Sequence, residues 1–238
     1  MTTPLVIIGY GKMGRLVDQL APDYGFDVRA CFSRSNIDAL SQQTLRGAAV
    51  AVEFSTPDAA PGNIRKLASL GVDTICGTTG WYGQLPQICS DIAQAGTALL
   101  YAANFSIGVN LFSEIASRAA ALFADHPEYE AWGWEIHHSA KKDSPSGTLK
   151  KLEQIMHAAG FTRAISLSAN RAGTHVGTHE IGFDSPSDTV TLRHAAKNRE
   201  GFARGALLAA RWIAGKKGVY EFREVLADLQ NRKSAAGS

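Results

Sequence analysis

Apolar residues in the first hundred positions fall into short runs with strand character, separated by longer runs with helical spacing. The strand-like runs cover 5–8, 28–32, 48–54, 73–76 and 98–102. Helical spacing of apolar positions covers 13–21, 58–70 and 84–95. Because strands and helices alternate, this half is expected to form a parallel sheet with right-handed crossovers.

The pattern changes after Phe105. Helices are expected over 107–124 and 149–159, with a strand ending at 133–137 between them. Strands over 164–168, 178–183 and 189–195 then follow one another, the last two joined by a turn at 185–188. Helices over 202–213 and 220–229 come next, and the small polar segment from Lys233 to Ser238 is expected to be disordered. The middle of the chain is therefore expected to be α+β.

Composition narrows the classes of protein without defining a function. The chain has 238 residues, of which 45% are hydrophobic and 19% charged, which is typical of a globular protein with one large or two modest domains. Its net charge is +2 with scattered positives, so neither nucleic acid nor a membrane is an expected partner. The three cysteines form no C-x-x-C pair, the N-terminus does not resemble a signal peptide, and no apolar run is long enough to span a membrane. We expect a cytoplasmic protein and no metal site.

A glycine-rich segment follows the first strand directly. Gly9-Tyr10-Gly11-Lys12-Met13-Gly14 matches G-x-G-x-x-G between a strand and a helix. In this motif the first glycine permits a tight turn, the second lets a pyrophosphate approach the backbone, and the third permits close helix–strand packing. Glycine turns also serve simple packing, but the context favours a dinucleotide, NADPH or NADH.

The end of the second strand bears on which dinucleotide is bound. An NAD-preferring site usually carries Asp or Glu there, to accept a hydrogen bond from the ribose 2′-hydroxyl. This chain has Ser33-Arg34 instead, and an arginine pairs well with a 2′-phosphate. The alternative is a solvated loop arginine, so both cofactors stay open.

Polar or glycine-rich residues follow three further strands. In an open α/β sheet the ligand binds at the carboxyl ends of the strands, and Thr or Asn there can also be simple helix caps. Three such ends in succession favour a shelf for the nicotinamide ribose and a substrate. They are Phe54-Ser55, Gly77-Thr78-Thr79 and Ala102-Ala103-Asn104-Phe105.

The segment 135–148 places two histidines and two lysines just before a predicted helix. The start of that helix, at Ser146-Gly147-Thr148, offers unpaired N–H groups and a dipole that favour a negatively charged ligand. Taken singly, a serine there is usually an N-cap, and one of two adjacent strand histidines is usually buried. Together these residues favour protonation of a small acidic substrate, with His137 and Lys141 as the proton-bearing groups.

Five segments occur in an order that carries a resemblance to a known family. They are Gly9–Gly14, Gly77–Gly80, Ala103–Asn110, Glu135–Thr148 and Phe202–Ala206. Over nearly its whole length the chain resembles the 4-hydroxy-tetrahydrodipicolinate (dihydrodipicolinate) reductase family. It departs from the family pattern in the short region after Phe32, in Ser144 where alanine is usual, and in the missing acidic residue after the second strand.

The resemblance implies an α/β fold with a Rossmann dinucleotide-binding domain over 1–105 and 199–238. An inserted α+β domain for substrate binding and tetramerisation would cover 106–198. The implied reaction is reduction of a cyclic dicarboxylate, 4-hydroxy-tetrahydrodipicolinate, by NAD(P)H in diaminopimelate and lysine biosynthesis. Hydride would be added at C4 and a proton at C3, in a homotetramer.

The chemistry of the residues and the resemblance together suggest a role for each. His137 would be the general acid and Lys141 a second cation that stabilises developing negative charge. His138, Ser146, Gly147, Thr148 and Thr79 would bind the substrate. The cofactor would be bound by Gly9, Tyr10, Gly11, Lys12, Met13, Gly14, Ser33, Arg34, Phe54, Ser55, Gly77, Thr78, Thr79, Ala102, Ala103, Asn104 and Phe105.

Two other classes remain open from the residues alone. One is another two-domain Rossmann oxidoreductase of amino-acid biosynthesis, such as a relative of aspartate-semialdehyde or homoserine dehydrogenase. The semialdehyde enzyme needs a nucleophilic cysteine, and here only Cys76 lies near a polar strand end. The other class is a non-catalytic dinucleotide-sensing module, which would have no use for His137 and Lys141.

Overall fold

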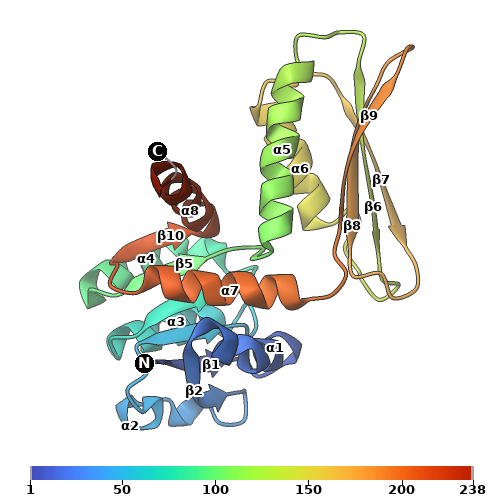
Figure 1. Cartoon of the computed structure of the whole chain (residues 1–238). Coiled ribbons are helices and arrows are strands. Elements are labelled where there is room, and N and C mark those ends of the chain that lie inside the picture. The colour runs from blue at the N-terminus through green and yellow to red at the C-terminus, as the bar shows by residue number, and fades with distance from the viewer. Residues whose placement is uncertain (1, 237–238) are drawn as a thin grey trace. The chain divides into compact units, whose positions relative to one another are not determined.

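The computed structural model describes residues 2–236, with side chains described as far as Arg232, and is shown in Figure 1. The chain divides into two compact units, one of Met1–Ile107 with Glu200–Ser238 and one of Gly108–Arg199. Among residues 2–236, no helix is both long and apolar enough to cross a membrane.

The first unit is built on a parallel sheet of six strands in the order β10-β5-β4-β3-β1-β2. Apolar strand residues face helices on both sides of this sheet, which explains the nearly continuous apolar runs in the sequence. The strands are β1 (Thr3–Ile8), β2 (Phe26–Phe32), β3 (Val50–Glu53), β4 (Asp73–Cys76), β5 (Ala98–Tyr101) and β10 (Gly218–Glu221). The helices are α1 (Lys12–Leu20), α2 (Gln42–Leu45), α3 (Ala60–Ser69), α4 (Leu85–Ala95), α7 (Glu200–Ile213) and α8 (Phe222–Ala236), with 3₁₀ turns at Ala21–Tyr24, Ile37–Ala39 and Tyr82–Gln84.

The end of the chain differs from the sequence prediction in two ways. Residues 218–221, partly predicted as helix, form the edge strand β10, which pairs with β5, and helix α8 begins only at Phe222. The apolar side chains of α8 that pack on the core are spaced for a helix, and this spacing hid the strand that precedes it. Helix α8 continues to Ala236, so the predicted disorder from Lys233 is wrong over 233–236, and residues 237–238 lie outside the described residues.

The second unit is a mixed sheet of four strands with helices on one face (Figure 1). Its order is β7-β6-β8-β9, in which β6 runs parallel to β7 and antiparallel to β8. Its elements are α5 (Ile107–Phe123), β6 (Glu130–His137), α6 (Gly147–Ala158), β7 (Ile165–Arg171), β8 (Thr178–Asp184) and β9 (Thr189–Ala195). The predicted α/β class with a second α+β part is confirmed, and so is the turn at 185–188.

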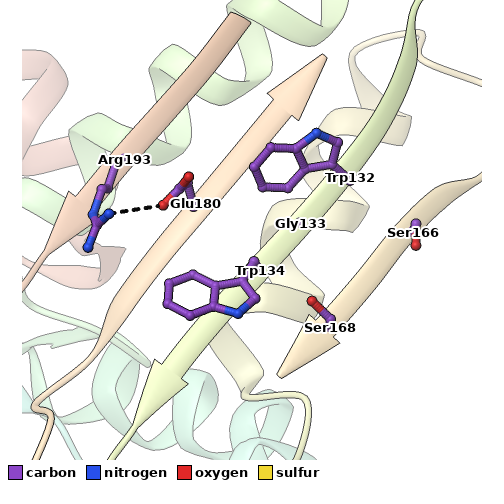
Figure 2. A pocket seen from close by; sticks show the side chains of 7 residues that line it. All are labelled: Trp132, Gly133, Trp134, Ser166, Ser168, Glu180 and Arg193. Carbon is purple, nitrogen blue, oxygen red and sulfur yellow. Dashed lines mark ion pairs between the residues drawn. The ribbon is translucent and has the colours of Figure 1, made fainter. Parts of the chain in front are cut away.

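Alternation along β6 decides which of its side chains reach the site. Ala131, Gly133, Glu135 and His137 are buried on the face that α5 and α6 cover. Trp132 and Trp134 point to the opposite face, where they line an open pocket with Arg193 and Glu180 (Figure 2). The pocket therefore lies on one face of the sheet, and the buried ionisable side chains of Glu135 and His137 lie on the other.

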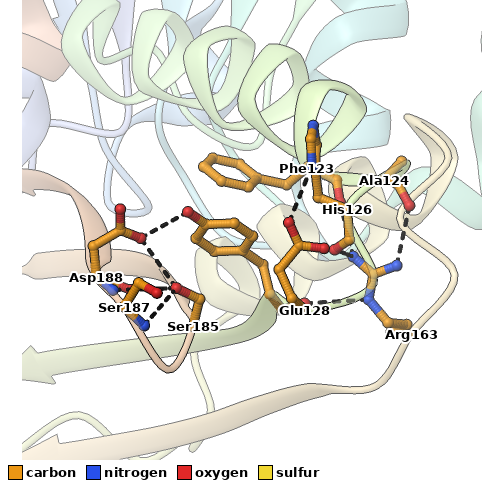
Figure 3. Close-up of polar contacts among 9 residues, drawn as sticks. Phe123, Ala124, His126, Glu128, Arg163, Ser185, Ser187 and Asp188 are labelled. Atoms are coloured by element: carbon orange, nitrogen blue, oxygen red, sulfur yellow. Dashed lines mark hydrogen bonds and ion pairs between the residues drawn. The ribbon is translucent and has the colours of Figure 1, made fainter.

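Arg163 holds the far end of this unit together (Figure 3). Its guanidinium donates to the backbone carbonyls of Phe123, Ala124 and His126 at 2.8, 3.0 and 3.0 Å, and to that of Tyr129 at 3.2 Å. The first of these carbonyls closes helix α5, whose last carbonyls have no partner within the helix. One side chain thus fixes the connection from α5 to β6.

Replacing Arg163 with glutamine should lower the free energy of unfolding by about 2–3 kcal/mol, because several hydrogen bonds from a charged donor to partly buried backbone carbonyls are lost. The measurement is urea denaturation followed by tryptophan fluorescence. Arg118→Gln, at an exposed position on α5, is the matched control and should change stability little. Equal losses in both variants would contradict the role of Arg163.

Candidate active site

The three glycines of the first loop differ in what surrounds them. A Cβ on Gly9, whose φ is +91°, would lie 2.2 Å from the carbonyl oxygen of Phe54. A Cβ on Gly14 would lie 2.3 Å from the carbonyl oxygen of Gly9, whereas one on Gly11 would meet no described atom within 4 Å. Gly11 is the N-cap of α1, and in the described chain no side chain caps this helix. The open glycine and the uncapped helix start fit the pyrophosphate of a dinucleotide.

The turn after β2 is compact. The backbone N–H of Ser33 donates to Oδ1 of Asn36 at 2.6 Å, and the hydroxyls of Ser33 and Ser35 lie 2.8 Å apart. Arg34 is exposed at the tip of this turn, and within residues 2–236 no carboxylate forms an ion pair with it. Another cation, Arg15 on α1, has its guanidinium 5.0 Å from the centre of the Tyr10 ring.

The other predicted cofactor residues gather at the carboxyl edge of the parallel sheet. The register pairs Ile8 with Glu53, Glu53 with Cys76, and Cys76 with Tyr101, so four strands end in line. The Phe54 ring packs against Gly77, where a Cβ would lie 2.0 Å from it, and meets Phe105 edge-on at 6.3 Å. The exposed residues Thr79 and Ala103 and the half-buried Ala102 and Asn104 follow β4 and β5.

A fully buried carboxylate that was not predicted from the sequence, Glu53, organises this edge. It accepts hydrogen bonds from the Ser55 hydroxyl, from Nδ2 of Asn63 at 3.2 Å and from Oγ1 of Thr78 at 2.6 Å. Glu53 thus ties the loops after β3 and β4 to helix α3. The signal in the sequence was a charged residue inside an apolar strand run, where a buried charge needs several polar partners.

Cys76 is also buried at this edge, with its Sγ 3.3 Å from Oε2 of Glu53. Burial and the neighbouring carboxylate raise the pKa of this thiol well above its usual value. A thiol of this kind is a poor nucleophile, which weighs against the semialdehyde-dehydrogenase alternative.

In the second unit, His137 lies at the end of β6 with 8% of its surface exposed. Its Nδ1 lies 3.6 Å from Oε2 of Glu135 and has no hydrogen-bond partner among the described residues. On its other side, a Cβ added to Gly177 would come within 2.9 Å of Nε2. Burial lowers the pKa of His137; the Glu135 charge opposes this shift, and the Lys141 and Arg171 charges add to it.

Glu135 is fully buried and contacts residues from three other segments. Its Oε1 accepts from the backbone N–H of Ser146 and from Nη2 of Arg171, both at 2.8 Å. Its Oε2 accepts from the Ser146 hydroxyl and lies 3.3 Å from Nε2 of His179. Burial opposes ionisation of Glu135, but the hydrogen bonds from Ser146 and Arg171 outweigh it and lower its pKa.

Helix α6 begins beside this cluster. Ser146 is its N-cap, with the hydroxyl accepting from the N–H of Leu149 at 3.2 Å. Because this hydroxyl also donates to Glu135 and lies 3.3 Å from Nε2 of His179, it already has three protein partners. Gly147 is exposed and Thr148 half-buried. The N–H of Gly147 contributes, after Lys141, to lowering the pKa of Asp143. A carboxylate of the protein therefore already approaches the predicted anion site.

The loop between β6 and α6 carries the remaining predicted residues. Nζ of Lys141 forms an ion pair with Asp143 at 2.7 Å, with 24% of the lysine side chain exposed, and His138 is half-buried. His137, Lys141, His138 and the start of α6 thus all lie in one strand–loop–helix segment of the second unit. Thr79, the fifth predicted substrate contact, belongs to the first unit.

Glu135, His137 and His179 also have a spacing that could hold a metal ion, with ligand atoms within 4.8 Å of one another. However, both oxygens of Glu135 already accept hydrogen bonds, and one lies beside the Arg171 guanidinium. A divalent cation there would face an arginine, so the charges favour protons over a metal as the species that this cluster holds.

A Rossmann-type sheet with a glycine-lined helix start, joined to a unit that holds a buried acid–base cluster, defines a nicotinamide-dependent oxidoreductase. Two family models match: "Dihydrodipicolinate reductase, N-terminus" over residues 3–105, and "Dihydrodipicolinate reductase, C-terminus" over residues 108–226. The chain belongs to the dihydrodipicolinate reductase family. The family and enzyme class expected from the sequence are confirmed.

Individual relatives agree with this assignment. The chain is 32% identical to the 4-hydroxy-tetrahydrodipicolinate reductase of Christiangramia forsetii, over 94% of this chain and 98% of the relative. It is 34% identical to the same enzyme of Methanoregula boonei, over 74% of each chain. The fold is similar to that of a dipicolinate-bound dihydrodipicolinate reductase from Paenisporosarcina sp. TG-14, with a TM-score of 0.74 and 23% identity over 93% of this chain and 98% of the other.

Proposed function

We propose that this enzyme reduces 4-hydroxy-tetrahydrodipicolinate to tetrahydrodipicolinate with NADPH or NADH, in diaminopimelate and lysine biosynthesis. The first unit would bind the cofactor and the second unit the substrate. The observation that carries the proposal is the convergence of His137, Lys141 and the start of α6 in one strand–loop–helix segment. These are the groups needed to protonate a dicarboxylate and to hold it.

The test is oxidation of NADPH, followed by absorbance, in the presence of the product of dihydrodipicolinate synthase. We expect turnover with this substrate and none with aspartate semialdehyde or with cofactor alone. Absence of turnover with both NADPH and NADH would overturn the proposed function.

In the proposed reaction, His137 is the proton donor. Loss of the 4-hydroxyl group as water leaves a conjugated C=C–C=N system, and a bound nicotinamide would supply the hydride at its C4. His137 would then donate the proton to C3 of the resulting enamine. Burial lowers the pKa of His137, which favours its neutral form when no ligand is bound. The negative charge of a bound dicarboxylate raises the pKa of a neighbouring histidine. Substrate binding thus favours the acid form, and the rate falls as pH rises through this pKa.

The substrate carboxylates would be bound by Lys141, His138 and the N–H groups of Gly147 and Thr148. The Asp143 carboxylate, now paired with Lys141, would give way to the substrate or share the lysine with it. Ser146 would contribute through its position as the cap of α6, since its hydroxyl is already engaged by Glu135. Thr79 is proposed to reach the substrate from the cofactor side.

Cofactor choice is proposed to depend on Arg34. If its guanidinium pairs with a 2′-phosphate, Arg34→Ala should raise KM for NADPH about tenfold or more and leave KM for NADH nearly unchanged, because a charged hydrogen bond is lost. Steady-state kinetics with both cofactors measure this. Arg29→Ala, whose native side chain is paired with Asp27 on β2, is the control. Equal changes in both KM values would mean that Arg34 only packs against the adenosine.

The protein is proposed to be a homotetramer that assembles through the open face of the second sheet. This face carries the pocket lined by Trp132 and Trp134 (Figure 2). Exposed apolar side chains on a sheet face are typical of protein interfaces.

The protein is also proposed to be cytoplasmic. Its three cysteines are free, as is usual for proteins in the reducing environment of the cytoplasm.

A further inference from the structure

Glu135 contacts both parts of the proposed site, the proton donor and the anion-binding helix start. The cluster brings together side chains from β6, β7, β8 and α6, because Glu135 lies opposite His179 and His137 lies opposite Arg171 in the sheet register. Both oxygens of Glu135 accept hydrogen bonds, two of them from Ser146. Glu135 is fully buried and lies against both His137 and the N-cap of α6, whereas Asp143, which also approaches the start of α6, is exposed.

We propose that Glu135 is a positioning residue: its buried carboxylate, paired with Arg171, holds the His137 ring electrostatically and ties the start of α6 to it. The inference rests on the proposed function for its role in the reaction. It concerns the geometry within the second unit and does not need the cofactor.

Arg171 sets the charge of this arrangement. A buried carboxylate without a counter-charge would repel a dicarboxylate and would itself tend to take up a proton. The Arg171 guanidinium, 2.8 Å from Oε1, leaves Glu135 ionised while the Glu135–Arg171 pair has no net charge. Glu135 can therefore stabilise the imidazolium of His137 at short range without imposing a negative field on the substrate.

The pKa of the neighbouring His179 indicates which of the two rings, His137 or His179, carries a proton. His179 is 4% exposed, and burial followed by the nearby His137 charge lowers its pKa to about 4. Its ring meets that of His137 edge-on at 5.1 Å. At working pH His179 is neutral, so a proton that enters this pair is carried by His137. His179 then acts as a hydrogen-bonding neighbour of Glu135.

The charged and titratable groups around His137 come from every element that packs against it. They are Glu135 on β6, Arg171 on β7, His179 on β8, with His194 on β9 behind it, and Lys141 and Asp143 in the loop before α6. Of these, Glu135 and Asp143 favour the imidazolium, and Glu135 is the larger influence.

The experiment is an NMR titration of the histidine rings in the full-length protein, combined with pH profiles of kcat/KM. Glu135→Gln keeps the size of the side chain and can still accept the N–H of Ser146. It should lower the pKa of His137 by about one unit, because a carboxylate within a few ångströms is lost. The falling limb of kcat/KM should move to lower pH by the same amount, with a roughly tenfold loss above that limb.

Arg171→Gln provides a test with the opposite sign. The two hydrogen bonds from Ser146 remain in this variant and keep Glu135 ionised, so removing the Arg171 cation should raise the pKa of His137. General damage to the site would instead move both variants in the same direction. Glu130→Gln, at the exposed start of the same strand, is the matched control and should leave the titration unchanged. An unchanged His137 pKa in Glu135→Gln would overturn the proposal, and so would shifts of the same sign in both variants. Because the titration needs no turnover, an inactive wild-type protein with the expected shifts would reject the proposed function and leave the role of Glu135 standing.

Discussion

Replacing His137 with glutamine is expected to lower kcat by about 10²–10⁴, the range typical for loss of a general acid. Glutamine keeps much of the size and some of the hydrogen-bonding capacity but has no titratable proton. The affinity for NADPH should change little, because the predicted cofactor loop belongs to the first unit. Steady-state kinetics and a cofactor titration measure both quantities.

The control for this substitution is His126→Gln, at an exposed histidine that pairs with Glu128 near the end of α5. It should leave kcat unchanged. If His137→Gln retained full kcat, His137 would not be the general acid, whatever its position beside Glu135.

Replacing Gly147 with valine should weaken binding of pyridine-2,6-dicarboxylate about 100-fold, because one or two hydrogen bonds to a charged group are blocked. The fold should tolerate the change, since a Cβ at this position meets no described atom within 4 Å and the helix start is exposed. NADPH should bind as it does to the wild type. Calorimetric titration of both ligands is the measurement.

Thr148→Val is the matched variant for comparison with Gly147→Val. It removes a hydroxyl and keeps the N–H, so it should cost only about 1–2 kcal/mol in dicarboxylate binding. If Gly147→Val lost NADPH and dicarboxylate alike, the start of α6 would be structural, and the carboxylate site would have to lie elsewhere.

Local signals were enough to predict the first unit from the sequence. Buried parallel strands are apolar along their whole length, and a glycine motif between a strand and a helix defines its own geometry. The edge strand β10 was not predicted because it is short and pairs with β5, which lies far away in the sequence. Its residues continue directly into an amphipathic helix, so periodicity alone could not separate the two.

Only part of the candidate active site could be predicted from the sequence, because some of its residues meet through contacts that are distant in the sequence. His137 and Lys141 stand together in the sequence, and strand alternation places Glu135 on the same face as His137. Arg171 and His179 reach the cluster through the register of neighbouring strands, which no local pattern contains. The buried Glu53 was missed similarly, since its partners come from a loop and a helix.

The division of the chain into two units separates two properties that selection could act on. Every contact of Glu135 described above lies within the second unit, while the turn at 33–36 belongs to the first. With the roles proposed above, substitutions around Arg34 would alter the preferred reductant without disturbing proton delivery. In the same way, changes near α6 would adjust substrate affinity at constant cofactor preference. An enzyme divided in this way would follow the supply of either dinucleotide in its host while its acid–base chemistry stayed the same.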